Sequence, residues 1–427
     1  MLFLLYSGLH GIFVTNIILF NPSNTAISQM RLLTAFIVAI LFLFLSVSSL
    51  AQRITKAASL SKNAFGWNQA EKELGFAHFD EVFKTSKVPR GRKTHVLMQG
   101  ASLAAFSKDG AKEKMLEYFI TEQKVAGLLI LQNGKIRLER YALGFSDSDR
   151  WTSQSIAKSV TSTLVGAAIK DGYIKSVDDL LTKYIPELKG SAYSKVTIKQ
   201  LLTMTTGIKW NENYTDPEAD IVKFYTHPID SGIDETVSYM RHLPAETEPG
   251  KKWVYKTGET HLLGVLVRAA TGKSLSEYLS QKIWKPYGME GKATWNLGRT
   301  NQEFAGCCLQ MKLRDFGRFG QFILDSAKIN GKPVVPDDWL QAATHTQVPL
   351  WPGWGYGYQW WTFDNGIFRA LGIHGQMIHI DPARQLVIVV TSAWPEAESY
   401  ARQLAADNFV KAISTELDKE KSLQKNK

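Results

Sequence analysis

Ser155-Ile156-Ala157-Lys158 opens a helical run in the first half of the chain and is the most informative feature of the sequence. Residues three apart share one face of a helix, so the Lys158 amine can approach the Ser155 hydroxyl and take its proton. Two further Ser-x-x-Lys matches begin at Ser59 and Ser422, because the pattern arises readily in a lysine-rich chain. Both lie in polar segments, and we interpret them as solvated.

The segment after Ser155 has the pattern of a buried helix. Small polar residues are interleaved with apolar residues at helical spacing, namely Ile156, Val160, Leu164, Val165, Ala168 and Ile169. We expect Thr152 or Ser153 to cap this helix and Gly172 to end it, and the free amides at its start would favour an oxyanion at Ser155. The alternative is a core helix with an incidental hydroxyl and a lysine that reaches solvent.

A second segment, Tyr255-Lys256-Thr257, offers a group that could pass the proton on to a leaving atom. It follows the turn-forming Pro249-Gly250 and precedes an apolar, helix-like run over 262–267. A tyrosine at such a junction can point its hydroxyl into a cleft, where it acts as a phenolate or as a hydrogen-bond relay. The commoner role of tyrosine is a half-buried ring with a hydrated hydroxyl, and this remains the alternative.

A third segment, Gly372-Ile373-His374-Gly375, leads into two β-rich runs around the turn at 381–384, which predict a hairpin. The glycines allow the backbone to approach a ligand, so the Ile373 amide could complete an oxyanion hole with the Ser155 amide. His374 could hydrogen-bond a substrate. Its alternative is a structural histidine on a strand.

The order Ser-x-x-Lys, Tyr-x-Thr, Gly-x-His-Gly resembles the serine β-lactamase and penicillin-binding-protein superfamily, in its class C-like esterase and amidase branch. The likeness covers roughly residues 95 to 412 and includes Ser176–Leu181, Tyr184–Leu188, Val196–Ile208 and Ala270–Ser274. Within the branch, Gly372–Gln376 and Trp210–Tyr214 are most similar to 6-aminohexanoate-dimer hydrolases, which cleave a linear amide and some carboxyl esters.

The resemblance implies an α/β (α+β) fold of the β-lactamase/transpeptidase type, with an antiparallel sheet flanked by helices and a mainly helical lobe. It also implies roles: Ser155 as nucleophile, Lys158 as general base, Tyr255 as proton relay, Tyr214 as a substrate-side hydroxyl, and Ile373 in the oxyanion hole, with His374 and Gly372 beside the substrate. Two departures argue against efficient β-lactam turnover. Thr257 stands where asparagine is usual, and no Lys-Thr-Gly or Lys-Ser-Gly triplet precedes the hairpin.

We therefore expect a serine hydrolase whose partner is a small-molecule ester or amide, cleaved through a Ser155 acyl-enzyme. Lys158 must be neutral to act as base, so burial beside Tyr255 and cations should lower its pKa. The aromatic run Trp351–Trp361 could form an apolar acyl pocket or pack between lobes. A D-amino-acid peptidase or weak β-lactamase is the alternative enzyme, and a non-catalytic peptidoglycan- or peptide-binding module is the alternative class.

Hydrophobic residues make up 44% of the chain and charged residues 21%, which indicates a large globular protein. An Asn133-Gly134 turn predicts a hairpin over 128–140, beside the strands at 377–390, with a helix over 400–417 packed on them. Helical insertions between 152 and 285 would form the second lobe. We divide the chain into a hydrophobic N-terminus (1–51), an N-terminal extension (52–95), a hydrolase domain (96–417) and a charged tail (418–427), which we expect to be disordered.

The N-terminus predicts export. Leu32–Leu45 is almost wholly apolar, and Ser49-Leu50-Ala51 resembles a signal cleavage site, with Met30 as a candidate start. An uncleaved anchor that associates with the membrane is the alternative. Either places the enzyme on the extracytoplasmic side, periplasmic or secreted.

The remaining features exclude several classes of protein. The net charge is +10, but the lysines are spread along the chain, so we expect no nucleic-acid binding. No metal-binding motif occurs, and we expect neither a metal nor a cofactor. Adjacent cysteines rarely bond to each other, so we expect Cys307 and Cys308 to fill space without a disulfide.

Overall fold

The computed structural model describes residues 32–39 and 52–425 of the chain, which divides into two compact units, 1–55 and 56–427. In the first unit, residues 32–39 form a helix whose side chains are all exposed. No helix among the described residues is both long enough and apolar enough to cross a lipid bilayer. The expected cleavage site and the candidate start lie outside the described residues.

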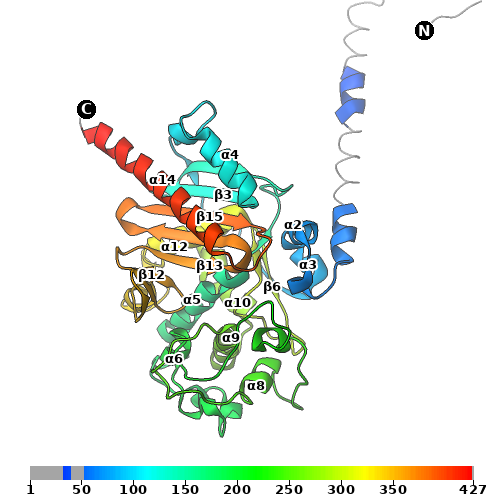
Figure 1. Ribbon diagram of the computed structural model, residues 1–427, viewed down its shortest axis with the longest axis vertical. Helices are drawn as coiled ribbons and strands as arrows, with labels where there is room; N and C mark the ends of the chain where they lie inside the picture. The colour runs from blue at the N-terminus through cyan, green and yellow to red at the C-terminus, as the bar shows by residue number, and fades with distance from the viewer. Residues whose placement is uncertain (1–31, 40–51, 426–427) are drawn as a thin grey trace, which may run out of the picture. The chain divides into compact units, whose positions relative to one another are not determined.

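A nine-stranded sheet forms the centre of the second unit (Figure 1). Its strands are, in order across the sheet, β10 (Val348–Trp351), β11 (Trp354–Tyr356), β12 (Trp361–Phe363), β13 (Phe368–Gly372), β14 (Gln376–Asp381), β15 (Leu386–Ser392), β3 (Val125–Gln132), β4 (Lys135–Tyr141) and β2 (Met98–Gln99). Both predicted hairpins are confirmed, because β3 pairs with β4 and β14 with β15. β15 also pairs with β3, which joins the hairpins as expected.

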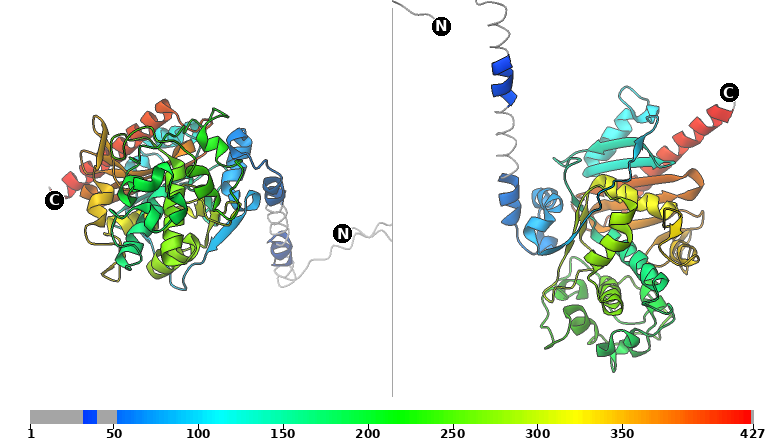
Figure 2. Two further views of the ribbon diagram at one scale, coloured as in Figure 1. Left: turned by 90° about the horizontal axis from the view of Figure 1, so that it is seen from below. Right: turned by 180° about the vertical axis from the view of Figure 1, so that it is seen from behind.

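The two faces of this sheet are covered by different helices because successive side chains of a strand point to opposite faces. Leu128 and Ile130 of β3 pack in one apolar cluster with α4 (Glu113–Glu122) and α14 (Tyr400–Lys425). Leu129 and Leu131 pack on the other face, against α12 (Leu313–Leu324). Figure 1 shows α14 across one face, and the view from behind in Figure 2 shows the other.

The last helix corrects one prediction, because α14 continues to Lys425 where we expected a disordered tail. Arg384, at the turn between β14 and β15, binds Asp418 at 2.8 Å. Arg137 of β4 binds Glu420 at 2.5 Å. These partners lie far away in the sequence, so the charges of the tail alone could not reveal them.

A mainly helical lobe is formed between residues 152 and 285, as expected. Its helices are α5 (Ala157–Lys170), α6 (Ile198–Leu202), α7 (Asp220–Lys223), α8 (Glu235–Met240), α9 (Thr257–Thr271), α10 (Leu275–Leu279) and α11 (Lys285–Tyr287). The mixed α and β architecture with antiparallel sheets is therefore confirmed.

A second, four-stranded sheet ties the N-terminal segment to the rest of this unit. Its order is β1 (Thr85–Val88), β6 (Ala293–Asn296), β7 (Leu309–Met311) and β5 (Trp151–Thr152). The segment before β1 carries α2 (Gln69–Ala77) and α3 (Phe79–Val82). The segment therefore belongs to the compact unit that holds the candidate site.

Candidate active site

Ser155 lies in a short 3-10 turn, η3 (Gln154–Ile156), directly before α5. Gln154 adopts a φ of +44°, which is uncommon for a residue other than glycine and turns the chain sharply before the serine. The side chain of Ser155 is buried, yet it lines a cavity of about 640 Å³. A hydroxyl held on such a turn at a cavity wall has the position that a nucleophile requires.

The predicted helix cap is wrong, since neither Thr152 nor Ser153 caps η3 or α5 with its side chain. The Ser153 hydroxyl instead accepts from the Leu309 amide at 3.1 Å and donates to the Gln154 carbonyl at 3.0 Å. The pairing of β5 with β7 brings Leu309 next to Ser153, which explains why the Ser153 hydroxyl bonds the Leu309 amide and not a helix amide. As expected, α5 ends just before Gly172, whose φ is +80°.

Lys158 contacts three oxygen atoms at the centre of the site. Its Nζ lies 2.9 Å from Ser155 Oγ, 3.0 Å from Thr257 Oγ1 and 2.9 Å from the Gly306 carbonyl oxygen. Only 2% of the side chain is exposed. Burial lowers the pKa of Lys158 to about 7, while the nearby Glu212 carboxylate raises it. The neighbouring charge that affects the pKa of Lys158 is thus an anion. Our expectation that nearby cations help to lower this pKa is wrong.

A neutral Lys158 fits these contacts. The neutral amine has two hydrogens, which the Thr257 hydroxyl oxygen and the Gly306 carbonyl can accept. Its lone pair then faces the Ser155 hydroxyl. This is the arrangement that a general base needs before it takes a proton.

Tyr255 lies on the loop just before α9, and its ring centroid is 4.9 Å from Lys158 Nζ. Burial and the Glu212 carboxylate raise the pKa of Tyr255 above its usual value, and a hydrogen bond with Ser155 acts in the opposite direction. A phenolate is therefore disfavoured, and the side chain is a neutral hydroxyl that can relay a proton. Trp361 stacks on the ring with centroids 5.8 Å apart and fixes its plane.

Glu212 is the residue of this site that our sequence reasoning missed. Its Oε1 accepts from the Tyr214 hydroxyl at 2.7 Å and from the Thr257 hydroxyl. Its Oε2 accepts from the Thr257 amide at 3.0 Å and from the Trp210 indole. Because Thr257 also accepts from Lys158, the carboxylate is joined to the base through one hydroxyl. The only signal for it was its place within Trp210–Tyr214, the segment that carried the resemblance.

The remaining predicted substrate-side residues lie around the same cavity, which Tyr214, Ile373 and His374 line together with Ser155. The Gly372 backbone closely approaches the serine, because a Cβ atom at this position would lie 2.9 Å from the Ser155 nitrogen. Glycine therefore keeps open the space beside the amide that the predicted oxyanion hole uses.

The His374 ring is engaged with a neighbouring loop. Its Nδ1 lies 2.8 Å from the Trp394 carbonyl oxygen, and since a carbonyl only accepts, Nδ1 carries the hydrogen. Burial lowers the pKa of His374 to about 4, which keeps the ring neutral. The His374 amide donates to the Ala397 carbonyl at 2.8 Å. These bonds correspond to the structural role that we kept as the alternative.

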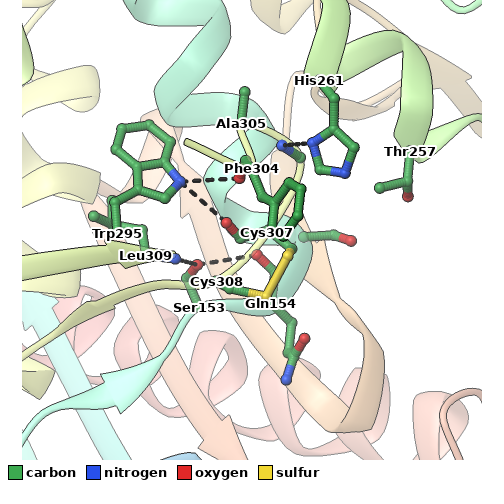
Figure 3. The surroundings of a disulfide bond; sticks show 12 residues. Ser153, Gln154, Thr257, His261, Trp295, Phe304, Ala305, Cys307, Cys308 and Leu309 are labelled. Carbon is green, nitrogen blue, oxygen red and sulfur yellow. Dashed lines mark hydrogen bonds between the residues drawn. A yellow bond between two sulfur atoms is a disulfide. The ribbon is translucent and has the colours of Figure 1, made fainter. Parts of the chain in front are cut away.

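Cys307 and Cys308 form a disulfide with each other (Figure 3), so the prediction of two unpaired cysteines is wrong. Cys308 adopts a φ of +68°, which turns the chain between β6 and β7. Both cysteines line the cavity, and Figure 3 shows the disulfide beside Gln154. The pair directly follows Gly306, the acceptor of the Lys158 amine, and so belongs to the site.

The aromatic run Trp351–Trp361 does not line this cavity. Trp354 and Trp361 pack against each other, and Trp361 also packs on Trp253 and Tyr255. The packing alternative therefore describes this run. Several of the rings that do line the cavity come from residues 62–84.

A sequence model of the β-lactamase family matches residues 113–410. The chain is 28% identical over 371 residues to the 6-aminohexanoate-dimer hydrolase of Paenarthrobacter ureafaciens, a match that covers 81% of this chain and 92% of that relative. A solved structure from Bacillus anthracis, assigned as a candidate 6-aminohexanoate-dimer hydrolase, superposes with a TM-score of 0.73 at 26% identity and covers 84% of this chain and 99% of the other.

A penicillin-binding protein from Bacillus halodurans superposes with a TM-score of 0.56 at 17% identity, over 69% of this chain and 99% of the other, which shows a shared fold. The expected β-lactamase/transpeptidase-like fold is thus confirmed. With a family match over most of its length and this fold, the chain belongs to the β-lactamase family of serine hydrolases.

Proposed function

We propose that this protein hydrolyses a carboxyl ester or a linear amide through an acyl-enzyme at Ser155. The observation that carries the proposal is the 2.9 Å contact between Lys158 Nζ and Ser155 Oγ, made by a lysine whose pKa burial lowers to about 7. The similarity to a 6-aminohexanoate-dimer hydrolase supports the choice of substrate class.

In the proposed reaction, Lys158 takes the proton of Ser155, and the Ser155 oxygen attacks the substrate carbonyl carbon. The amides of Ser155 and Ile373 stabilise the negative charge on the carbonyl oxygen. Tyr255 gives its proton to the leaving oxygen or nitrogen and recovers one from Lys158. Tyr214 is the hydroxyl on the substrate side, and water then releases the acyl group from Ser155.

The network around Thr257 favours an ester or linear amide over a β-lactam. The Thr257 hydroxyl accepts from Lys158 and donates to Glu212, so its one hydrogen is already used within the protein. It cannot also donate to a substrate amide without breaking this network. We therefore expect a fluorescent penicillin to label the protein poorly.

The test is intact-mass spectrometry of the full-length protein after exposure to a fluorophosphonate probe. We expect one adduct on the wild type and none on Ser155→Ala. Ser59→Ala is the matched control, because Ser59 begins another Ser-x-x-Lys match but its exposed hydroxyl donates to the Lys56 carbonyl at 2.8 Å. It should keep the adduct. A folded wild type without an adduct would instead favour a binding module, and rapid penicillin labelling would favour a peptidase or β-lactamase.

A further inference from the structure

The cavity beside Ser155 has an aromatic wall. Seven phenylalanine and tyrosine rings line it: Phe65, Phe76, Phe79, Phe83, Tyr214, Tyr225 and Phe304. The ring centroids of Phe65 lie 5.8 Å from Tyr214 and 6.0 Å from Tyr225, and Tyr225 lies 5.3 Å from Phe304. The volume of the cavity, about 640 Å³, falls within the range of small-molecule sites.

Most charged side chains at this cavity are either paired with other groups of the protein or exposed to solvent. Glu235 binds the Arg299 side chain at 2.9 Å and its amide at 2.8 Å. Lys84 donates to the Asn301 side chain at 2.5 Å. Lys62 is exposed to solvent. The lining therefore leaves aromatic surface, and not an unpaired buried charge, to meet a ligand.

The position of Tyr255 indicates which part of a substrate enters. Ser155 and Ile373 line the cavity, whereas Tyr255 is not among its lining residues. In the proposed reaction Tyr255 gives a proton to the leaving atom, so the leaving group lies on the Tyr255 side. The other part of the substrate, which stays bonded to Ser155, is then directed into the cavity.

We propose that this cavity is the acyl-binding subsite and that it takes an uncharged hydrocarbon acyl group, a medium-length alkyl chain or an aryl group. This inference rests on the proposed function, because it requires acylation of Ser155. Burial of each added methylene against the aromatic wall should strengthen binding of the acyl group.

The N-terminal segment supplies four of these seven rings and so determines this specificity. Phe79 and Phe83 pack together with centroids 4.5 Å apart, and Trp67 packs behind them at 5.8 and 6.1 Å. Gln69 of α2 donates to the Ala393 carbonyl at 2.8 Å, which fastens the segment to the residues after β15. The wall is therefore held in place before a substrate arrives.

The test measures kcat/KM of the full-length protein for p-nitrophenyl esters that share one leaving group and differ in acyl length from acetate to octanoate. We expect kcat/KM to rise by about fourfold per methylene until the cavity is filled, the factor that corresponds to the transfer of one methylene from water. Phe65→Ala and Phe83→Ala should lower the octanoate-to-acetate ratio. Phe363→Ala, which removes a half-buried ring outside the cavity, should leave the ratio unchanged.

A fluorophosphonate adduct measured on the same samples separates the two proposals. An adduct at Ser155 together with a flat or falling chain-length series would overturn the acyl subsite and leave the hydrolase function standing. A ratio that falls equally in the Phe363 variant would also overturn it, because the wall would not be the cause. A folded wild type that forms no adduct would overturn both.

Discussion

The Nζ atom of Lys158 lies 2.9 Å from the carbonyl oxygen of Gly306, the residue directly before the disulfide. The Gly306 amide donates in turn to His261 Nδ1 at 3.0 Å. Gly306 is thus held on both sides of its backbone. This carbonyl accepts one hydrogen of the neutral amine, which helps to point the lone pair of Lys158 at Ser155. The loop that carries Gly306 therefore orients the base.

Replacement of the lysine tests this orientation most directly. Lys158→Met removes the base, and we expect the rate of fluorophosphonate labelling to fall by about 10²- to 10⁴-fold, the usual contribution of general base catalysis. Lys158→Arg should be equally impaired, since guanidinium keeps its proton at every working pH. Cooperative thermal unfolding of both variants would establish that they fold. Near-wild-type labelling of either folded variant would rule out Lys158 as the base.

The pH dependence follows from the lowered pKa of Lys158. Only the neutral amine accepts a proton, so the labelling rate should rise with pH through about 7 and level off above it. On the acid side the rate should fall about tenfold per pH unit, as the neutral fraction does. A rate measured from about pH 5 to 9 checks this profile. An inflection near the ordinary lysine value would mean that Lys158 stays charged in the folded protein.

Glu212→Gln should move that inflection to lower pH, because the carboxylate raises the pKa of Lys158. Glutamine has nearly the same shape, and its oxygen can still accept from the Trp210 indole and the Thr257 amide. Its amide group would donate to the hydroxyls of Tyr214 and Thr257, which lose the carboxylate as acceptor of their own hydrogens. The comparison is the pH profile of labelling for variant and wild type. A shift toward higher pH would contradict the electrostatic role given to Glu212.

Local patterns were sufficient to predict most of the fold. The Asn133-Gly134 turn between two apolar runs predicts β3 and β4, because this turn type suits the twist of a hairpin. The helical C-terminal tail was not predictable. Its charges look solvated in the sequence, and the arginines that bind them, Arg384 at the turn between β14 and β15 and Arg137 on β4, come from other elements of the fold.

At the site, too, contacts between neighbours in the sequence were predictable and contacts between distant segments were not. Ser155 and Lys158 meet through the local geometry of one turn, so their spacing was informative. Glu212 is a loop carboxylate whose donors come from more than one segment, and nothing near it in the sequence marks it as the centre of a hydrogen-bond network. The part of the aromatic wall that comes from residues 62–84 was not predictable for the same reason, since only the tertiary structure places those rings at the cavity beside Ser155.

The disulfide should influence catalysis through Gly306. When the bond between Cys307 and Cys308 is broken, the loop can relax, and Lys158 loses a fixed acceptor for one of its hydrogens. A single hydrogen bond contributes about 0.5–1.5 kcal/mol, so we expect labelling to slow by about two- to tenfold. The measurement compares wild type with and without a phosphine reductant, with free thiols counted by mass.

The double variant Cys307→Ser/Cys308→Ser is the matched control for this prediction, because it lacks the bond and cannot respond to reductant. We expect it to react as slowly as the reduced wild type under both conditions. Equal rates for oxidised and reduced wild type, with two free thiols confirmed, would mean that His261 alone holds Gly306 in place. In that case His261→Ala, and not reduction, should displace the carbonyl and slow the labelling.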